Sequence, residues 1–229
     1  MMNKGFKAAN GSVLSFSSIA SLAWAPTVKI EPGDLCIIRL STDNLSATTP
    51  TYTCADASGN TWTTIIQKAT NATAAAGISG AIFASKITKA IPQSTGTITI
   101  TYSGAVAAHT AYIETYLGFD ITLRSAAVSA AGASAAASVV SGAVNAGDLV
   151  IGMTAVETRT APTAGDTDTL NGAWSNLVTF ANSGSGTDNT RVQVNGQYKI
   201  PTASGAQTYD NAVTNTDWVA MIAVFQASP

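Results

Sequence analysis

Residues 33–38 (GDLCII) and residues 147–151 (GDLVI) are two versions of one motif, a Gly-Asp turn followed by a short apolar run. Further matches follow in the same order along the chain: NTW at 60–62 with NGAW at 171–174, and KAIP at 89–92 with KIP at 199–201. The separations shrink from 147 − 33 = 114 to 174 − 62 = 112 and then to 201 − 92 = 109 residues. Solenoid units repeat at roughly 20–50 residues, so this repeat predicts two copies of a whole domain.

The hydrophobic pattern around these motifs is typical of β-strands. Residues 97–102 (TITITY) alternate strictly, which places the two isoleucines and the tyrosine on one face and the threonines on the other. Residues 191–200 alternate as well, whereas 35–40 and 149–153 are nearly continuous apolar runs, as expected for strands in the middle of a sandwich. The pattern predicts an all-β fold of two tandem antiparallel β-sandwich (jelly-roll-like) domains related by duplication.

The repeat also suggests where the domains begin and end. We expect an N-terminal arm over residues 1–12, a first sandwich over 13–120, a linker over 121–135 and a second sandwich over 136–229. The Ala- and Ser-rich residues 125–138 have no apolar stripe that would support a helix. By comparison with the first copy, the second domain is expected to open with a strand at Ala136.

Composition excludes several kinds of partner. The chain has 229 residues, of which 46% are hydrophobic, so two cores can form. Only 10% are charged, against an average of about 25%. Lys and Arg occur singly, so no basic stripe could neutralise phosphates, and no basic amphipathic helix indicates a membrane surface. We therefore expect neither nucleic acid nor membrane as a partner.

Both cysteines, Cys36 and Cys54, fall in the first copy. Each lies in an apolar, strand-like run, where free cysteine is commonly buried. The sequence leaves two alternatives open, reduced core thiols or a disulfide. Two sulfurs with a single histidine cannot build the usual four-ligand zinc site.

The N-terminus imitates a signal peptide. Two lysines precede an apolar stretch from Val13 to Leu22, which ends in a small-x-small tripeptide. Four serines interrupt that stretch, so we expect an uncleaved arm. No apolar run approaches the roughly 20 residues that a transmembrane helix needs.

No catalytic constellation stands out. His109 is the only histidine and is expected on a solvent-facing loop. The three glutamates are Glu31, Glu114 and Glu157, and the alternation around Glu114 predicts that it points outward. We expect a non-enzymatic protein with no cofactor and no resident metal.

The best indication of a ligand is a pair of acidic loops. Asp166 and Asp168, with Asn171, place oxygen atoms at alternate positions, as Ca²⁺ prefers, and residues 56–60 (DASGN) do the same. Neither loop has the closing glutamate of an EF-hand. Asx residues also stabilise turns by bonding their own backbone, so loop calcium near Asp166 and Asp168 stays an alternative to turn stabilisation.

Trp62 and Trp174 occupy equivalent places in the two copies. A large ring at the start of a strand fills the space between two sheets, so both are expected to be structural core anchors. The aromatic residues without a counterpart are better candidates for surface contacts: Trp24, Tyr52, Tyr112, Tyr116 and Phe119.

The recurring frame consists of Gly-Asp-Leu before a strand, the group Asp56, Gly59, Asn60 and Trp62 before another, an alternating Thr-Ile strand and a closing aromatic strand. It resembles the jelly-roll-like β-sandwich domains of tailed-bacteriophage virion proteins and of some bacterial surface proteins. The resemblance covers about residues 13–120 and 136–226, and the second copy departs from it just before its tryptophan.

This resemblance implies a capsid decoration (cement) protein that binds the outer surface of a phage head and stabilises it. The implied partners are the major capsid protein and neighbouring copies of the chain, in a homo-oligomer that could be a trimer. The implied location is the capsid exterior of the virion, after synthesis in the host cytoplasm. We expect association through sheet edges or the N-terminal arm, whose candidate interface residues are Met1, Asn3, Lys4, Phe6 and Lys7. The alternative is a tail, fibre or cell-surface module that binds host glycan or receptor.

Overall fold

The computed structural model describes residues 4–15, 19–43, 50–70, 77–158, 165–181 and 191–229. These residues form antiparallel β-strands and no helix, and so include no helix that could cross a membrane. The all-β antiparallel fold expected from the hydrophobic pattern is confirmed. The strands are β1 (Gly5–Ser15), β2 (Ile19–Trp24), β3 (Leu35–Asp43), β4 (Tyr52–Asp56), β5 (Thr63–Ala69), β6 (Ile78–Lys86), β7 (Ile98–Val106), β8 (His109–Leu117), β9 (Phe119–Leu123), β10 (Val128–Val140), β11 (Leu149–Glu157), β12 (Val178–Ala181), β13 (Val192–Lys199) and β14 (Thr208–Ala227).

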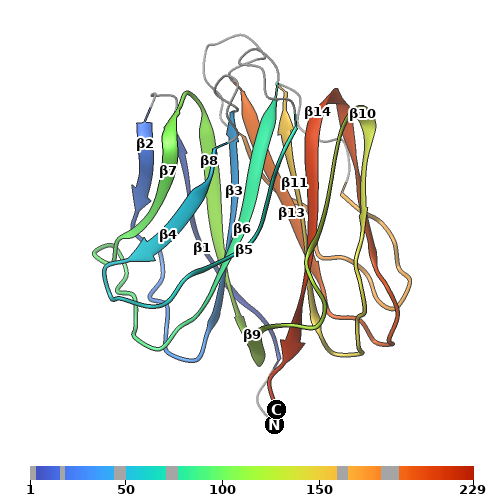
Figure 1. The fold of residues 1–229 in the computed structure, drawn as a ribbon. Coiled ribbons are helices and arrows are strands. Elements are labelled where there is room, and N and C mark those ends of the chain that lie inside the picture. The colour runs from blue at the N-terminus through green and yellow to red at the C-terminus, as the bar shows by residue number, and fades with distance from the viewer. Residues whose placement is uncertain (1–3, 16–18, 44–49, 71–76, 159–164, 182–190) are drawn as a thin grey trace.

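The strands lie in four layers (Figure 1). The first layer is the sheet β2-β7-β4, and the second is β1-β8-β3-β6-β5. The third is β10-β14-β11-β13-β12, with β9 beside the end of β14. In the fourth layer, residues 136–140 of β10 pair with residues 208–212 of β14, after the two strands turn over together at a register shift. The central sheets have the same strand order when β1, β8, β3, β6 and β5 are matched in turn with β10, β14, β11, β13 and β12.

The two central sheets pack face to face through one apolar core. Leu35 and Ile37 from the second layer meet Leu149, Ile151 and other residues of the third. Consequently β3 and β11 are buried at all nine positions, which explains the nearly continuous apolar runs at residues 35–40 and 149–153. Separate cores fill the space between the first and second layers and between the third and fourth.

Two segments differ from the domain boundaries expected from the sequence. Residues 121–135, expected to be a linker, contain the end of β9 and the first half of β10, and both strands pair with β14. From Gly5 onward, the expected N-terminal arm (residues 1–12) is β1 and pairs with β8 inside the chain. The halves are therefore joined by a shared core rather than by a linker.

An ion pair lies at the centre of the packing between the two central sheets. The fully buried guanidinium of Arg39 on β3 donates to the Glu114 carboxylate on β8 and, at 3.1 Å, to the backbone oxygen of Gln197 on β13. The Tyr116 hydroxyl donates to the same carboxylate at 2.7 Å, and the Tyr112 ring lies 5.0 Å from the guanidinium carbon. Burial alone would lower the pKa of Arg39, but the adjacent Glu114 raises it and keeps the guanidinium charged. The expectation that Glu114 points to solvent is wrong, because β8 is covered on both faces.

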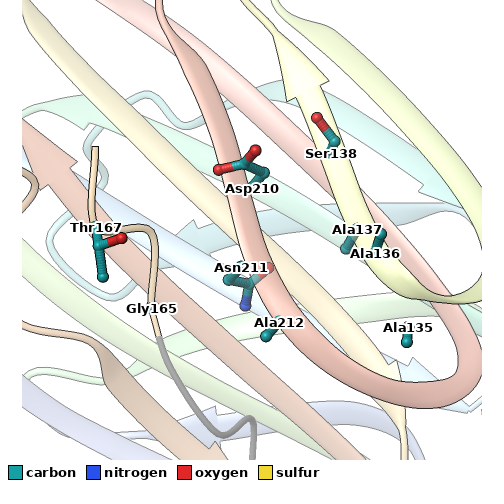
Figure 2. A pocket seen from close by; sticks show the side chains of 9 residues that line it. All are labelled: Ala135, Ala136, Ala137, Ser138, Gly165, Thr167, Asp210, Asn211 and Ala212. Carbon is teal, nitrogen blue, oxygen red and sulfur yellow. The ribbon is translucent and has the colours of Figure 1, made fainter. Parts of the chain in front are cut away.

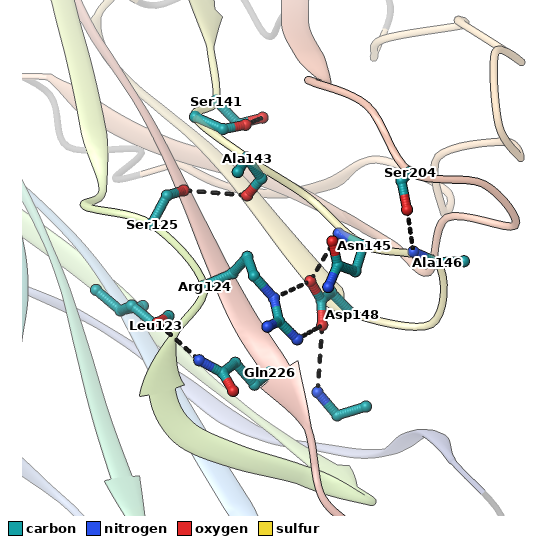
Figure 3. Close-up of polar contacts among 12 residues, drawn as sticks. Leu123, Arg124, Ser125, Ser141, Ala143, Asn145, Ala146, Asp148, Ser204 and Gln226 are labelled. Carbon is teal, nitrogen blue, oxygen red and sulfur yellow. Dashed lines mark hydrogen bonds and ion pairs between the residues drawn. The ribbon is translucent and has the colours of Figure 1, made fainter.

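The repeated Gly-Asp motif forms the same turn in both halves. Asp34 accepts the backbone N–H of Glu31 at 3.0 Å, and Asp148 accepts that of Asn145 at 2.9 Å. The intervening glycines have φ values of 94° and 81°, a region that favours glycine. Each aspartate also pairs with a basic side chain. Lys7 pairs with Asp34 at 2.7 Å. Figure 3 shows the second pair, Arg124 with Asp148 at 2.9 Å. The first turn therefore connects the start of β3 to β1, and the second connects the start of β11 to the segment after β9.

We expect Arg39→Met to lower the free energy of unfolding by about 3–5 kcal/mol, because it leaves the Glu114 carboxylate buried without a counter-charge. The double variant Arg39→Met/Glu114→Leu should recover most of that loss. Urea denaturation of both variants measures the difference. A single variant as stable as the wild type would contradict the role given to the ion pair.

Close approach of the central sheets depends on Gly196. A Cβ added there would lie 2.0 Å from the Tyr112 hydroxyl and 2.8 Å from Arg39 Cδ. We expect Gly196→Ala to lower the free energy of unfolding by about 1–3 kcal/mol through overpacking. Gly104→Ala is the matched control, because an added Cβ in that strand meets nothing within 4 Å. Equal denaturation midpoints for the two variants would contradict the packing described here.

Candidate functional site

A groove of about 400 Å³ opens at the fourth layer (Figure 2). One side consists of residues 135–138 of β10, which are three alanines and a serine. Residues 210–212 of β14 and the loop residues Gly165 and Thr167 form the rest. The groove therefore combines small apolar side chains with a few hydroxyl, amide and carboxylate groups.

The interior next to this groove is polar because of the sequence of β13. Gln193, Asn195, Gln197 and Lys199 share the face of β13 that turns toward the fourth layer, and each is at most 4% exposed. The matching face of β6 carries Ser79, Ala81, Phe83 and Ser85, and contributes to an apolar core. The alternation in residues 191–200 predicts the apolar face of β13, but no local pattern indicates that the opposite, polar face is buried as well.

The loop over residues 165–175 is held by the polar row. The Gln197 amide oxygen accepts the Asp166 N–H at 2.7 Å, and its amide nitrogen donates to the backbone oxygens of Asp166 and Ser175 at 3.1 and 2.7 Å. Lys199 donates to the backbone oxygen of Leu170. On its far side, the Asp166 carboxylate accepts the backbone N–H of Asp210 at 3.0 Å. The loop therefore lies beside β14. In the first half, the corresponding place beside β7 is taken by the strand β4.

Three carboxylates gather at the mouth of the groove. Oxygens of Asp166, Asp168 and Asp210 lie within 4.8 Å of one another. Burial raises the pKa of Asp166, and the two neighbouring carboxylates add to the effect against backbone hydrogen bonds that lower it. A divalent cation is the ligand that such oxygens would suit. However, both oxygens of Asp166 already accept backbone N–H groups, of Asp168 and Asp210.

The two acidic loops considered for calcium differ in their contacts. Asp166 and Asp168 do come together, but with Asp210 rather than with Asn171, whose backbone oxygen accepts the N–H of Thr202. In the first half, Asp56 accepts the backbone N–H of Ser58 at 2.8 Å and the indole N–H of Trp62 at 2.6 Å. These are the bonds of a stabilised turn.

Several buried polar atoms in this interior lack a hydrogen-bond partner among the described residues. They include both amide atoms of Asn195, the Gln193 amide oxygen, the Tyr209 hydroxyl, the Asn211 amide nitrogen and the Trp174 indole nitrogen. Asn195 is opposite Thr154 on β11, and the Thr154 hydroxyl bonds Asn211 at 2.6 Å. Such a group of polar atoms has the chemistry to bind ordered water or a small polar ligand.

The residues considered for catalysis are separated and lie in structural contacts. His109 is fully buried at the start of β8, with its ring 5.7 Å from that of Tyr102, so the expectation of a solvent-facing histidine is wrong. Glu31 pairs with Lys29 at the surface, and Glu114 belongs to the central ion pair. Glu157 accepts the backbone N–H of Gly77 at 3.0 Å. The described residues bring no two of these groups into one site.

The two tryptophans have different environments. Trp174 is 7% exposed in the core of the second half, with its ring edge-to-face against Tyr209 at 5.1 Å. Trp62 is half-buried and packs against the core of the first half. Four of the aromatic residues proposed for surface contacts are at most 4% exposed, because their strands are covered by neighbouring layers: Tyr52, Tyr112, Tyr116 and Phe119.

The predicted interface residues lie on or beside β1, except that Met1 and Asn3 are outside the described residues. Lys4 is exposed, and Lys7 pairs with Asp34. Phe6 is 42% exposed and stacks on Tyr198 of the third layer at 5.6 Å. Phe6 therefore contacts both halves of the chain, and only part of its ring can meet another molecule.

Cys36 and Cys54 are free thiols that face the core between the first and second layers. Burial raises the pKa of both, and neighbouring groups such as Asp56 raise it further. A high pKa leaves little thiolate, the reactive form. The reduced alternative is the one present in this structure.

Comparison with family models, with curated proteins and with solved structures found no match to this chain.

Acid sensitivity is expected from His109. Burial lowers its pKa to about 4, against about 6.5 in an unfolded chain. The folded state therefore favours the neutral ring, and the stability that this contributes is full above pH 6.5 and falls as the pH drops toward 4. Between pH 7 and 4, the wild type should lose up to about 3 kcal/mol relative to His109→Asn. Denaturation of both proteins at each pH measures this, and parallel stability curves would contradict it.

Proposed function

We propose that the chain is a non-enzymatic structural protein of a virion that binds the outer surface of a phage head and stabilises it, as a capsid decoration protein does. The observation that carries the proposal is the single core between the central sheets, which makes both halves one stiff body. A protein that reinforces a shell has to transmit force between contact points without deforming. A close-packed four-layer stack has that property.

The exposed face of the first layer is a candidate surface for binding to the phage head. Its cross-strand rows include Ser21–Thr101–Thr53 and Ala23–Thr99–Ala55, and these rows carry hydroxyl and methyl groups and no charge. Burying a charge without a partner costs far more than burying hydroxyl groups that find hydrogen bonds. Such a face can therefore lie against a protein surface at small desolvation cost.

The proposal includes a duplication of one jelly-roll-like unit. Its support is the common strand order of the central sheets, the common Gly-Asp turn and the basic partner of each turn aspartate. Tandem units give a decoration protein two sets of contacts, and linked contacts raise the effective affinity for a repeating lattice.

A second candidate is a tail, fibre or cell-surface module that binds host glycan. The groove beside Asp210 favours it, because its volume and its hydroxyl, amide and carboxylate groups suit a small saccharide. The buried aromatic residues weaken it, since their rings are not free to stack on sugars.

We expect purified heads that lack the protein to bind it in hundreds of copies and to withstand higher temperature once coated. Thr101→Lys should weaken this binding by about ten-fold, because it places a charge in the middle of the first-layer face. Ala203→Lys, on an exposed loop, is the control and should bind as the wild type does. Co-sedimentation and thermal release of the genome provide the measurements. Binding to tails alone, or to glycans on an array, would contradict the decoration role and favour the glycan-binding module instead.

A further inference from the structure

β10 is an edge strand with one neighbour. It stands at the end of the third layer and pairs with β14 alone among the described residues. Its first part, Val128–Ser134, runs straight beside residues 216–222 of β14 before the register shift turns both strands into the fourth layer. Within the described ranges, one row of backbone N–H and C=O groups along this part has no partner strand.

The other edges of the sheets carry features that discourage pairing with another chain. β10 is 13 residues long, and its straight part has no register shift, no proline and no charged residue. The remaining edge strands are short, irregular or charged. β1 has Lys7 and two register shifts, β2 has one shift, and β5 has Lys68 and one shift. β4, β9 and β12 have five, five and four residues.

The straight part of β10 also packs closely against Trp218 of its neighbour β14. A Cβ added at Gly132 would lie 2.7 Å from the Trp218 ring, so the strand passes close over this nearly buried indole. The indole N–H donates to the Ser134 hydroxyl at 3.3 Å. A strand that is already rigid loses little conformational entropy when it pairs.

We infer that the β10 edges of two copies pair antiparallel across a two-fold axis, which joins the third layers of both copies into one continuous sheet. An antiparallel strand can pair with itself, and such an isologous contact closes as a dimer. Identical strands meet without repulsion here because residues 128–134 (VSAAGAS) are uncharged, and the small side chains at Ala131 and Ala133 let the backbones approach. The inference does not depend on the proposed function, since it concerns only contacts between copies.

Sedimentation velocity from about 1 to about 200 µM tests the inference, because this range of concentrations covers weak to moderate self-association. Ala131→Lys should weaken the dimer about five-fold or more, since it places like charges near each other across the axis. Raising the salt concentration should restore part of the affinity. Ala9→Lys, at an exposed alanine of the edge strand β1, should leave the dimer unchanged.

Hydrogen exchange of the wild type gives a reading that needs no variant. Amides of residues 129–134 should become protected as the protein concentration rises, while those of β4 and β12 should not. A protein that stays monomeric over this range, or a dimer that Ala131→Lys leaves intact, would overturn the inference. So would protection of β10 by purified heads without any pairing between copies, because the occupant would then be a capsid strand.

Discussion

The structure depends on the burial of both faces of its two central sheets. A single antiparallel sandwich leaves the outer face of each sheet to solvent, and its strands alternate between apolar and polar residues. Here β3 and β11 are covered on both sides, so polar residues in these strands have to find partners inside the protein. Arg39 shows the consequence, because it bonds Glu114 in its own sheet and the backbone of β13 in the facing sheet. Buried pairs of this kind add little net stability, but removing one partner is costly because the other charge stays buried.

The Gly-Asp turns at the end of the layers also place a buried polar side chain where partners inside the protein are available. Each turn aspartate is nearly fully buried and would be costly without its basic partner and its backbone donors. In Asp148, burial by itself would raise the pKa, and the hydrogen bonds from Arg124 and the backbone lower it instead. The basic residues come from β1 in one half and from the segment after β9 in the other. The turns therefore connect the beginning of each half to its central strand.

The sequence was sufficient for elements whose pattern depends only on their nearest layer. The alternation in residues 97–102 and the apolar run after Gly33 predicted β7 and β3 with their buried faces. Glu114 was misplaced because alternation in β8 was interpreted as a contrast between core and solvent, although both faces are buried. Contacts such as Gly196 against Tyr112 depend on residues 84 positions apart, 196 − 112, and no local pattern records them. β10 was missed as an edge because its Ala- and Ser-rich sequence has no periodicity to interpret.

The two halves have the same framework but differ in what fills it. In the first half, β4 pairs with β7 over a mostly apolar interior. In the second half, a loop held by Gln197 takes the corresponding place over a row of buried amides, and a groove opens beside it. A strand pair provides backbone bonds at every second residue, whereas the loop relies on a few side chains, so local opening should cost less there. If the chain has a ligand or a variable contact, this half is where the fold can accommodate it without disturbing the central core.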